Sequence, residues 1–243
     1  MRTSIVAVVG SLLMLNVAAA DDRQWFVDAL QRSRSGISET ESYINEFTST
    51  KNFPNALSLG TTSDGYRNIE KLEFQIDALR HYNERLTTYL HVLHSRVIGM
   101  NSLLADRQRD LHFKLQAADG AFRPIFLNLR SLNEESKASW MGRRELLLSQ
   151  QRTIEQINFS TLQLRFAAHG FKEQLLAAGP FPEQTAQIQK DAAEKLSMGA
   201  ADVNAGLLRL RELLSPSPKE VQSVSPPIPS AAAALPSATK QRS

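Results

Sequence analysis

Between residues 69 and 104, apolar side chains recur at alternating steps of three and four, and Asn83 is the one polar member of the series. This spacing places side chains on a single face of an α-helix. The series, called the 69–104 stripe below, consists of Ile69, Leu72, Ile76, Leu79, Asn83, Leu86, Leu90, Leu93, Val97, Met100 and Leu104. It predicts a helix from residue 66 to about residue 118, a rod of about 80 Å.

Two interpretations of this stripe compete. With Ile69 at heptad position a, the stripe has β-branched residues at several a positions, Leu at most d positions and one Asn at a, which is typical of the seam of a two-stranded parallel coiled coil. Such a coil carries paired charges beside its seam, whereas here Tyr82, Tyr89 and Leu103 widen the apolar face. A wider face suits a helix packed against two neighbours in a bundle. We favour a core private to one chain, and a homo-oligomer that shares the far end of the stripe stays open.

Three further helices are predicted, and no segment shows the alternation of a strand. Residues 21–49 form the first, with a break at Gly36, and 51–65 form a loop from which Ser63 or Asp64 caps the 66–118 helix. A second long helix runs from residue 124 to about 168, where Gly170 interrupts the pattern, and a last one runs from 183 to 214. The fold class is therefore all-α: an elongated helical bundle around a long antiparallel hairpin of coiled-coil character.

The expected inward faces of the other helices follow from the same periodicity. In the first helix they are Trp25, Phe26, Ala29 and Leu30, then Ile37, Ile44 and Phe47. In the second long helix they are Ile125, Leu129, Leu132, Trp140, Leu147, Ile154 and Ile157. In the last helix they are Ile188, Ala192, Leu196, Val203, Leu207, Leu210 and Leu214.

The two ends of the chain differ in composition from the middle. Arg2, an apolar run over 5–17 and the small residues Ala18 to Ala20 are typical of a secretory signal with cleavage after residue 20. The apolar run is short for a membrane anchor, which is the competing interpretation. Residues 215–243 are rich in Pro, Ser and Ala and predict a disordered tail. The domains expected are a signal peptide over 1–20, the bundle over 21–214 and the tail.

Composition and charge limit the classes of protein and of partner that the chain can represent. The chain has no cysteine, which excludes a disulfide scaffold and thiol chemistry. Its formal charge of +3 includes Arg2 and is not clustered on one face, so no nucleic-acid partner is expected. We expect a secreted or periplasmic protein with no transmembrane segment after signal cleavage. Asn158-Phe159-Ser160 is a possible glycosylation acceptor within a helical pattern.

Candidate chemistry is sparse, and we expect neither catalytic residues nor a cofactor. His91 and His94 could both reach one metal ion from a helix, but two ligands make a weak site, so no metal residue is assigned. Glu134 and Glu135 point about 100° apart on a helix, which does not suit an acid–base pair. Met100 is better explained as a core residue than as a haem ligand.

These observations predict a non-enzymatic protein that acts through contacts with other proteins. The expected function is that of an exported structural or adaptor protein at the cell envelope or outside the cell, such as a component of a secretion or surface assembly. The alternative is an exported helical-bundle carrier of a lipid or of non-covalent haem.

Overall fold

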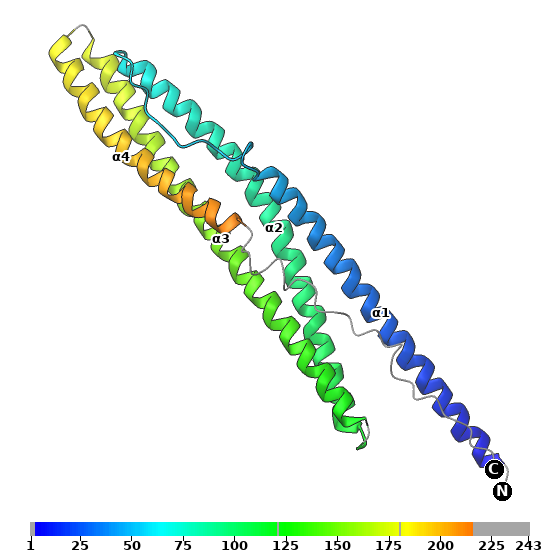
Figure 1. Cartoon of the computed structure of the whole chain (residues 1–243). Helices are drawn as coiled ribbons and strands as arrows, with labels where there is room; N and C mark the ends of the chain where they lie inside the picture. Colours follow the sequence, from blue (N-terminus) through cyan, green and yellow to red (C-terminus); the bar gives the residue numbers. More distant parts are fainter. Residues whose placement is uncertain (1–2, 121, 180, 216–243) are drawn as a thin grey trace.

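The chain folds into four α-helices in the computed structural model, which describes residues 3–120, 122–179 and 181–215, with side chains from residue 24 onward. The helices are α1 (Thr3–Phe47), α2 (Gly65–Ala117), α3 (Arg123–Ala178) and α4 (Pro182–Leu214). These described residues contain no strand. The predicted all-α bundle with an elongated shape is therefore confirmed (Figure 1).

The two longest helices, α2 and α3, form an antiparallel hairpin that runs the length of the rod (Figure 1). The helix α2 begins where the side chain of Asp64 accepts a hydrogen bond from the backbone N–H of Arg67, 3.1 Å away. That contact satisfies a donor left free at the first turn. At the turn, the carbonyl of Asp119 accepts from the backbone N–H groups of Phe122 and Arg123, which starts α3.

Each half of the hairpin is covered by a different partner. The helix α4 lies beside the half of α3 nearest the α3–α4 turn, and α1 lies beside the half of α2 nearest the α2–α3 turn (Figure 1). Close approach of α4 depends on Gly199 and Gly206, where an added Cβ would lie 2.9 Å from Leu164 Cδ1 and 2.7 Å from Ile157 Cγ1. The chain leaves α3 through Gly179, whose φ of 55° favours glycine.

The loop between α1 and α2 runs back along α2 and fills the space between α2 and α4 (Figure 1). Leu57 is buried, and the side chain of Asn204 on α4 bonds to both its backbone groups, accepting from the N–H at 2.7 Å and donating to the carbonyl at 2.9 Å. Asn68 likewise donates to the carbonyl of Thr62 at 2.7 Å. These side chains take the place of the backbone partners that an irregular segment lacks.

Two predicted helix boundaries are wrong, both at glycines. The helix α1 continues through Gly36, because Arg96 of α2 donates from its guanidinium to the Gly36 carbonyl and, at 2.6 Å, to Thr40 Oγ1. Gly36 makes room for this arginine, since an added Cβ would lie 3.2 Å from its Nη1. The helix α3 also continues past residue 168 and Gly170, since the buried Phe171 packs in the core beyond them.

Some predicted inward residues lie on the surface instead. Trp25, Ile125 and Leu132 are exposed, because α1 and α3 near these positions have no helix covering that side. The cleavage point predicted after residue 20 lies within α1, and export stays a prediction. The predicted tail lies outside the described residues, apart from Ser215.

Candidate functional site

All eleven members of the 69–104 stripe are buried within the single chain. On one side of the stripe, Gln75, Tyr82, Tyr89 and Arg96 contact the loop and α1. On the other side α2 contacts α3, as in the ion pair between Asp77 and Arg165 at 3.2 Å. The stripe is thus covered by elements of its own chain and offers no open surface at these positions.

Asn83, the polar member of the stripe, is fully buried and faces Asn158 on α3. Its Nδ2 donates to Asn158 Oδ1 over 2.7 Å, while its own Oδ1 has no partner among the described residues. Asn158 itself is exposed, so water can reach the rest of its amide. The candidate glycosylation acceptor therefore lies on the surface of α3 with its oxygen engaged by α2.

An aromatic cluster lies at the middle of the rod, where the end of α1 and the loop contact α2 and the end of α4 contacts the loop. Phe47 stacks on Tyr82 with ring centroids 4.7 Å apart, and Phe53 contacts Tyr82 edge-on at 5.8 Å. Arg211 of α4 lies over the Phe53 ring at 5.1 Å. Burial raises the pKa of Tyr82 to about 12, and its hydroxyl has no hydrogen-bond partner among the described residues.

The residues considered for metal or acid–base chemistry are far from forming a site. His91 contacts Gln151 of α3 at 3.3 Å, and His94 is half-buried. Glu134 accepts from Arg130 at 3.1 Å and from Gln108 at 2.6 Å, which leaves it paired on the surface. Within the described ranges no group of three or more His, Cys, Asp or Glu is placed to hold a metal ion.

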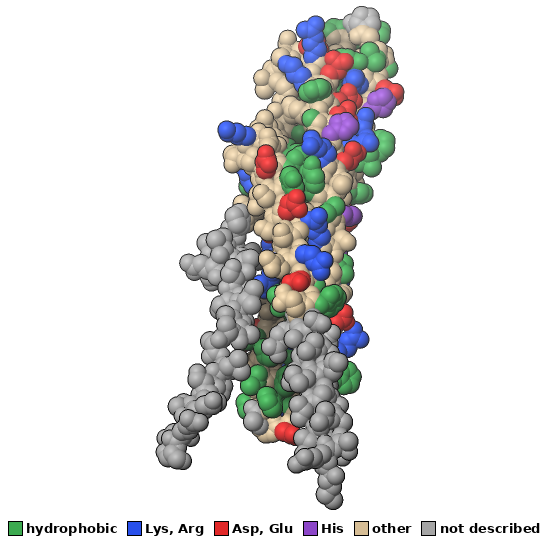
Figure 2. Space-filling model, turned by 90° about the vertical axis from the view of Figure 1, so that its right-hand side faces the viewer, with side chains coloured by type: hydrophobic (Ala, Val, Ile, Leu, Met, Phe, Trp, Pro, Cys, Tyr) green, Lys and Arg blue, Asp and Glu red, His purple; other side chains and the backbone are tan. Residues whose placement is uncertain are grey.

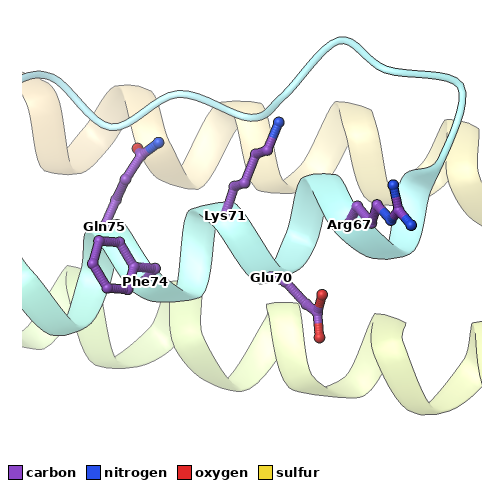
Figure 3. Close-up of a pocket in the computed structure, with 5 residues that line it drawn as sticks. All are labelled: Arg67, Glu70, Lys71, Phe74 and Gln75. Carbon is purple, nitrogen blue, oxygen red and sulfur yellow. The ribbon is translucent and has the colours of Figure 1, made fainter.

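A shallow groove of about 450 Å³ lies on the first turns of α2 (Figure 3). It is lined by Arg67, Glu70, Lys71, Phe74 and Gln75, all from one helix, and Phe74 and Glu70 point to the α3 side while Lys71 and Gln75 point to the loop. At its α3 edge the hydrogen bond from Lys172 to Glu73, 2.8 Å long, raises the pKa of Lys172. A groove with one helical wall does not enclose a lipid or haem, which need most of their surface covered.

The end of the α2–α3 hairpin carries large apolar side chains that face solvent. These residues, called the hairpin-tip cluster below, are Phe113, Phe122, Ile125 and Leu127. Ile125 and Leu127 lie about 160° apart on α3, so the apolar side chains surround the tip instead of forming one face. The helix α4 covers only the far half of the hairpin, so it does not reach them (Figure 1). Three nearby basic side chains are paired on their own helices: Lys114 with Asp110 at 3.0 Å, Arg130 with Glu134, and Arg109 with Asp106. Arg123, directly after Phe122, is exposed and has no ion-pair partner among the described residues.

Our sequence reasoning missed the hairpin-tip cluster, although a signal for it exists. Directly after the turn, apolar residues occupy positions 122, 125, 126, 127 and 129, which lie all around the first turns of α3. A surface helix buries one stripe, so this surplus predicts exposed apolar side chains. On the face of the rod seen in Figure 2, acidic and basic side chains are interspersed with apolar groups.

In the part of the chain whose side chains are described, no helix is long and apolar enough to cross a membrane. Comparisons of the chain with protein families, with characterised proteins and with solved structures found no match.

Proposed function

We propose that this chain is an exported, non-enzymatic structural or adaptor protein that acts through protein–protein contacts at the cell envelope or outside the cell. The hairpin-tip cluster carries the proposal. It presents Phe113, Phe122, Ile125 and Leu127 at the end of a rod of about 80 Å. Covering large apolar side chains is the main favourable term in protein association, at about 25 cal/mol per Å² removed from water.

The chemistry around the tip favours a protein partner over a lipid surface. A segment that lies in a membrane interface combines apolar side chains with free basic ones. At this tip, Lys114, Arg109 and Arg130 are already paired with carboxylates of their own helices, which leaves Arg123 as a basic side chain without an ion pair among the described residues. Four exposed apolar side chains beside one basic side chain suit an apolar surface of another protein, as at the centre of protein interfaces.

Site-specific photo-crosslinking in the native organism tests this proposal. A photoreactive phenylalanine analogue at Phe122 is compared with the same analogue at Phe181, which lies at the opposite end of the hairpin and is equally exposed, at 62%. Both residues precede a helix with proline in its first turn, so the two positions are matched in local structure. We expect a discrete protein adduct from position 122 and none from position 181.

Equal adducts from the two positions, or none from position 122, would contradict a partner at the tip. A second arm measures co-sedimentation of the purified protein with vesicles containing anionic lipid. Binding that is lost in Phe122→Ser would replace the protein partner with a membrane surface.

A further inference from the structure

The outward side of α3 carries a second stripe that no other described element covers. Residues buried against α2 and α4 recur along α3 at Ile154, Ile157, Thr161 and Leu164. A second set lies about 150° around the helix from them, with steps of three and four. This α3 outer stripe consists of Arg152, Glu155, Phe159, Leu162, Phe166, His169 and Glu173, all exposed.

The apolar centre of this stripe is prominent. Phe159 is 62% exposed and Phe166 is 69% exposed, with Leu162 between them. Single exposed apolar residues are common on surfaces, but three in helical register form a continuous ridge. At the edge toward α2 the charges are already paired, Arg165 with Asp77 at 3.2 Å and Lys172 with Glu73 at 2.8 Å. The ridge therefore has a neutral border.

The stripe is complementary to a second copy of itself that runs in the opposite direction. From the N-terminal end it reads basic, acidic, three apolar residues, histidine, acidic. When two copies lie antiparallel with a two-fold axis beside Leu162, Arg152 lies opposite Glu173 of the second copy and Glu155 opposite His169 of the second copy. Phe159 then lies opposite Phe166 of the second copy. The two members of each pair lie at the same level along the helix axes to within one residue, about 1.5 Å.

The charges at the two ends of the stripe are available for such pairing. Neither Arg152 nor Glu155 has an ion-pair partner among the described residues, and Glu173 contacts only His169 of its own helix there, at 3.3 Å. A different protein or an anionic lipid surface would not require the residues of the stripe to be self-complementary in antiparallel order. An isologous interface between identical chains does require it, because each residue meets its counterpart across the axis.

We propose that two copies of this chain associate through the α3 outer stripe in antiparallel orientation. This inference is independent of the partner proposed for the hairpin tip. Three large apolar side chains make an interface below the standard size of about 800 Å² per partner, so the dimer dissociates in roughly the micromolar range.

Charge reversal tests both the surface and the register. In sedimentation equilibrium of the purified protein between about 1 and 200 μM, the wild type is expected to shift from monomer to dimer. Arg152→Glu places two glutamates opposite each other at both ends, and Glu173→Arg does the same with arginines, so each should weaken the dimer about tenfold. The double variant restores opposite charges and should return to within about threefold of the wild type.

Arg209→Glu on α4 is the matched control, because this arginine is exposed and lies off the stripe. It should leave the dissociation constant unchanged, whereas Phe166→Asp should leave only monomer with an unaltered helical melting curve. A wild type that stays monomeric throughout the range would overturn the proposal. So would a double variant as weak as the single ones, or a control variant that weakens the dimer equally.

Discussion

Asn83 donates a hydrogen bond to Asn158 across the α2–α3 interface, with 2.7 Å between Nδ2 and Oδ1. In a parallel two-stranded coil, an asparagine at this heptad position would meet its own counterpart from a second chain. Here its partner is 75 residues further along the same chain. Asn83, whose heptad position favoured a dimer in the sequence pattern, therefore has one of its two polar side-chain atoms hydrogen-bonded inside the monomer.

Replacing Asn83 with leucine is expected to stabilise the fold without changing the mass in solution. The substitution keeps the branched shape and removes a buried Oδ1 that has no partner among the described residues. Leaving such a buried atom unpaired costs about 1–3 kcal/mol of stability, whereas the hydrogen bond lost by the substitution contributes about 1 kcal/mol. Asn158 is exposed, so its side chain can bond to water instead. Urea unfolding should show a gain of about 1 kcal/mol.

The control for this substitution is Asn158→Ala, which removes the partner but leaves Asn83 buried. It should lower the free energy of unfolding by about 1–3 kcal/mol, because both atoms of the Asn83 amide are then unpaired. A change in oligomeric state caused by Asn83→Leu would contradict the private core.

Tyr82 should make the fold sensitive to alkaline pH. Burial raises its pKa from the ordinary 10.0 to about 12, so its contribution to stability is complete below about pH 10 and is lost as the pH rises toward 12. Tyr82→Phe has no group to ionise, so its urea midpoint should fall less than that of the wild type between pH 9 and 11.5. Tyr43→Phe, at an exposed position, is the control and should follow the wild type. Parallel curves for wild type and Tyr82→Phe would argue against burial of this hydroxyl.

Much of the fold could be predicted because one rule governs it. Each helix buries a stripe of period 3.6, and for α2 and α4 the predicted ends and faces match the structure within a residue or two. The two errors at Gly36 and Gly170 have a common cause, since glycine was read as a breaker of isolated helices. Inside a packed bundle, tertiary contacts decide, and at Gly36 the missing side chain admits Arg96.

The candidate surfaces were harder to predict. The exposure of Phe122 and Phe166 depends on where α4 ends and on which side of α3 it packs, and neither follows from the periodicity of α3 alone. A helix that carries two apolar stripes gives no local indication of which one its neighbours cover. The partner of Asn83 was equally hidden, because it depends on the register between α2 and α3.

Gly206→Ala should loosen the contact between α4 and α3. The added methyl group would lie 2.7 Å from Ile157 Cγ1, a branch atom close to the backbone that cannot move away easily. Overpacking costs about 1–3 kcal/mol, against about 1 kcal/mol gained from helix propensity, so a net loss of about 1 kcal/mol is expected in thermal unfolding. Gly142→Ala on α3 is the control, since nothing lies within 4 Å of its added Cβ, and it should stabilise instead. Stabilisation by both substitutions would contradict the close approach.

The protein isolated from its native compartment should begin at Asp21. Ala18 and Ala20 provide the small residues that a signal peptidase recognises, and Asp21 follows directly. Intact-mass spectrometry measures the cleavage point. Recovery of a chain that retains Met1 and the apolar run in a membrane fraction would contradict export with cleavage.

The 69–104 stripe is closed inside its own chain by the antiparallel α2–α3 hairpin. The chain has no native cysteine, so nitroxide labels attach only where cysteine is introduced. Gln108 of α2 and Glu134 of α3 face each other, with 2.6 Å between Nε2 and Oε1. The measurement is the dipolar broadening of the double variant Gln108→Cys/Glu134→Cys, repeated after tenfold dilution with unlabelled protein. An intrachain hairpin predicts strong broadening that dilution leaves unchanged, whereas loss of the broadening on dilution would show that the stripe is closed by a second chain.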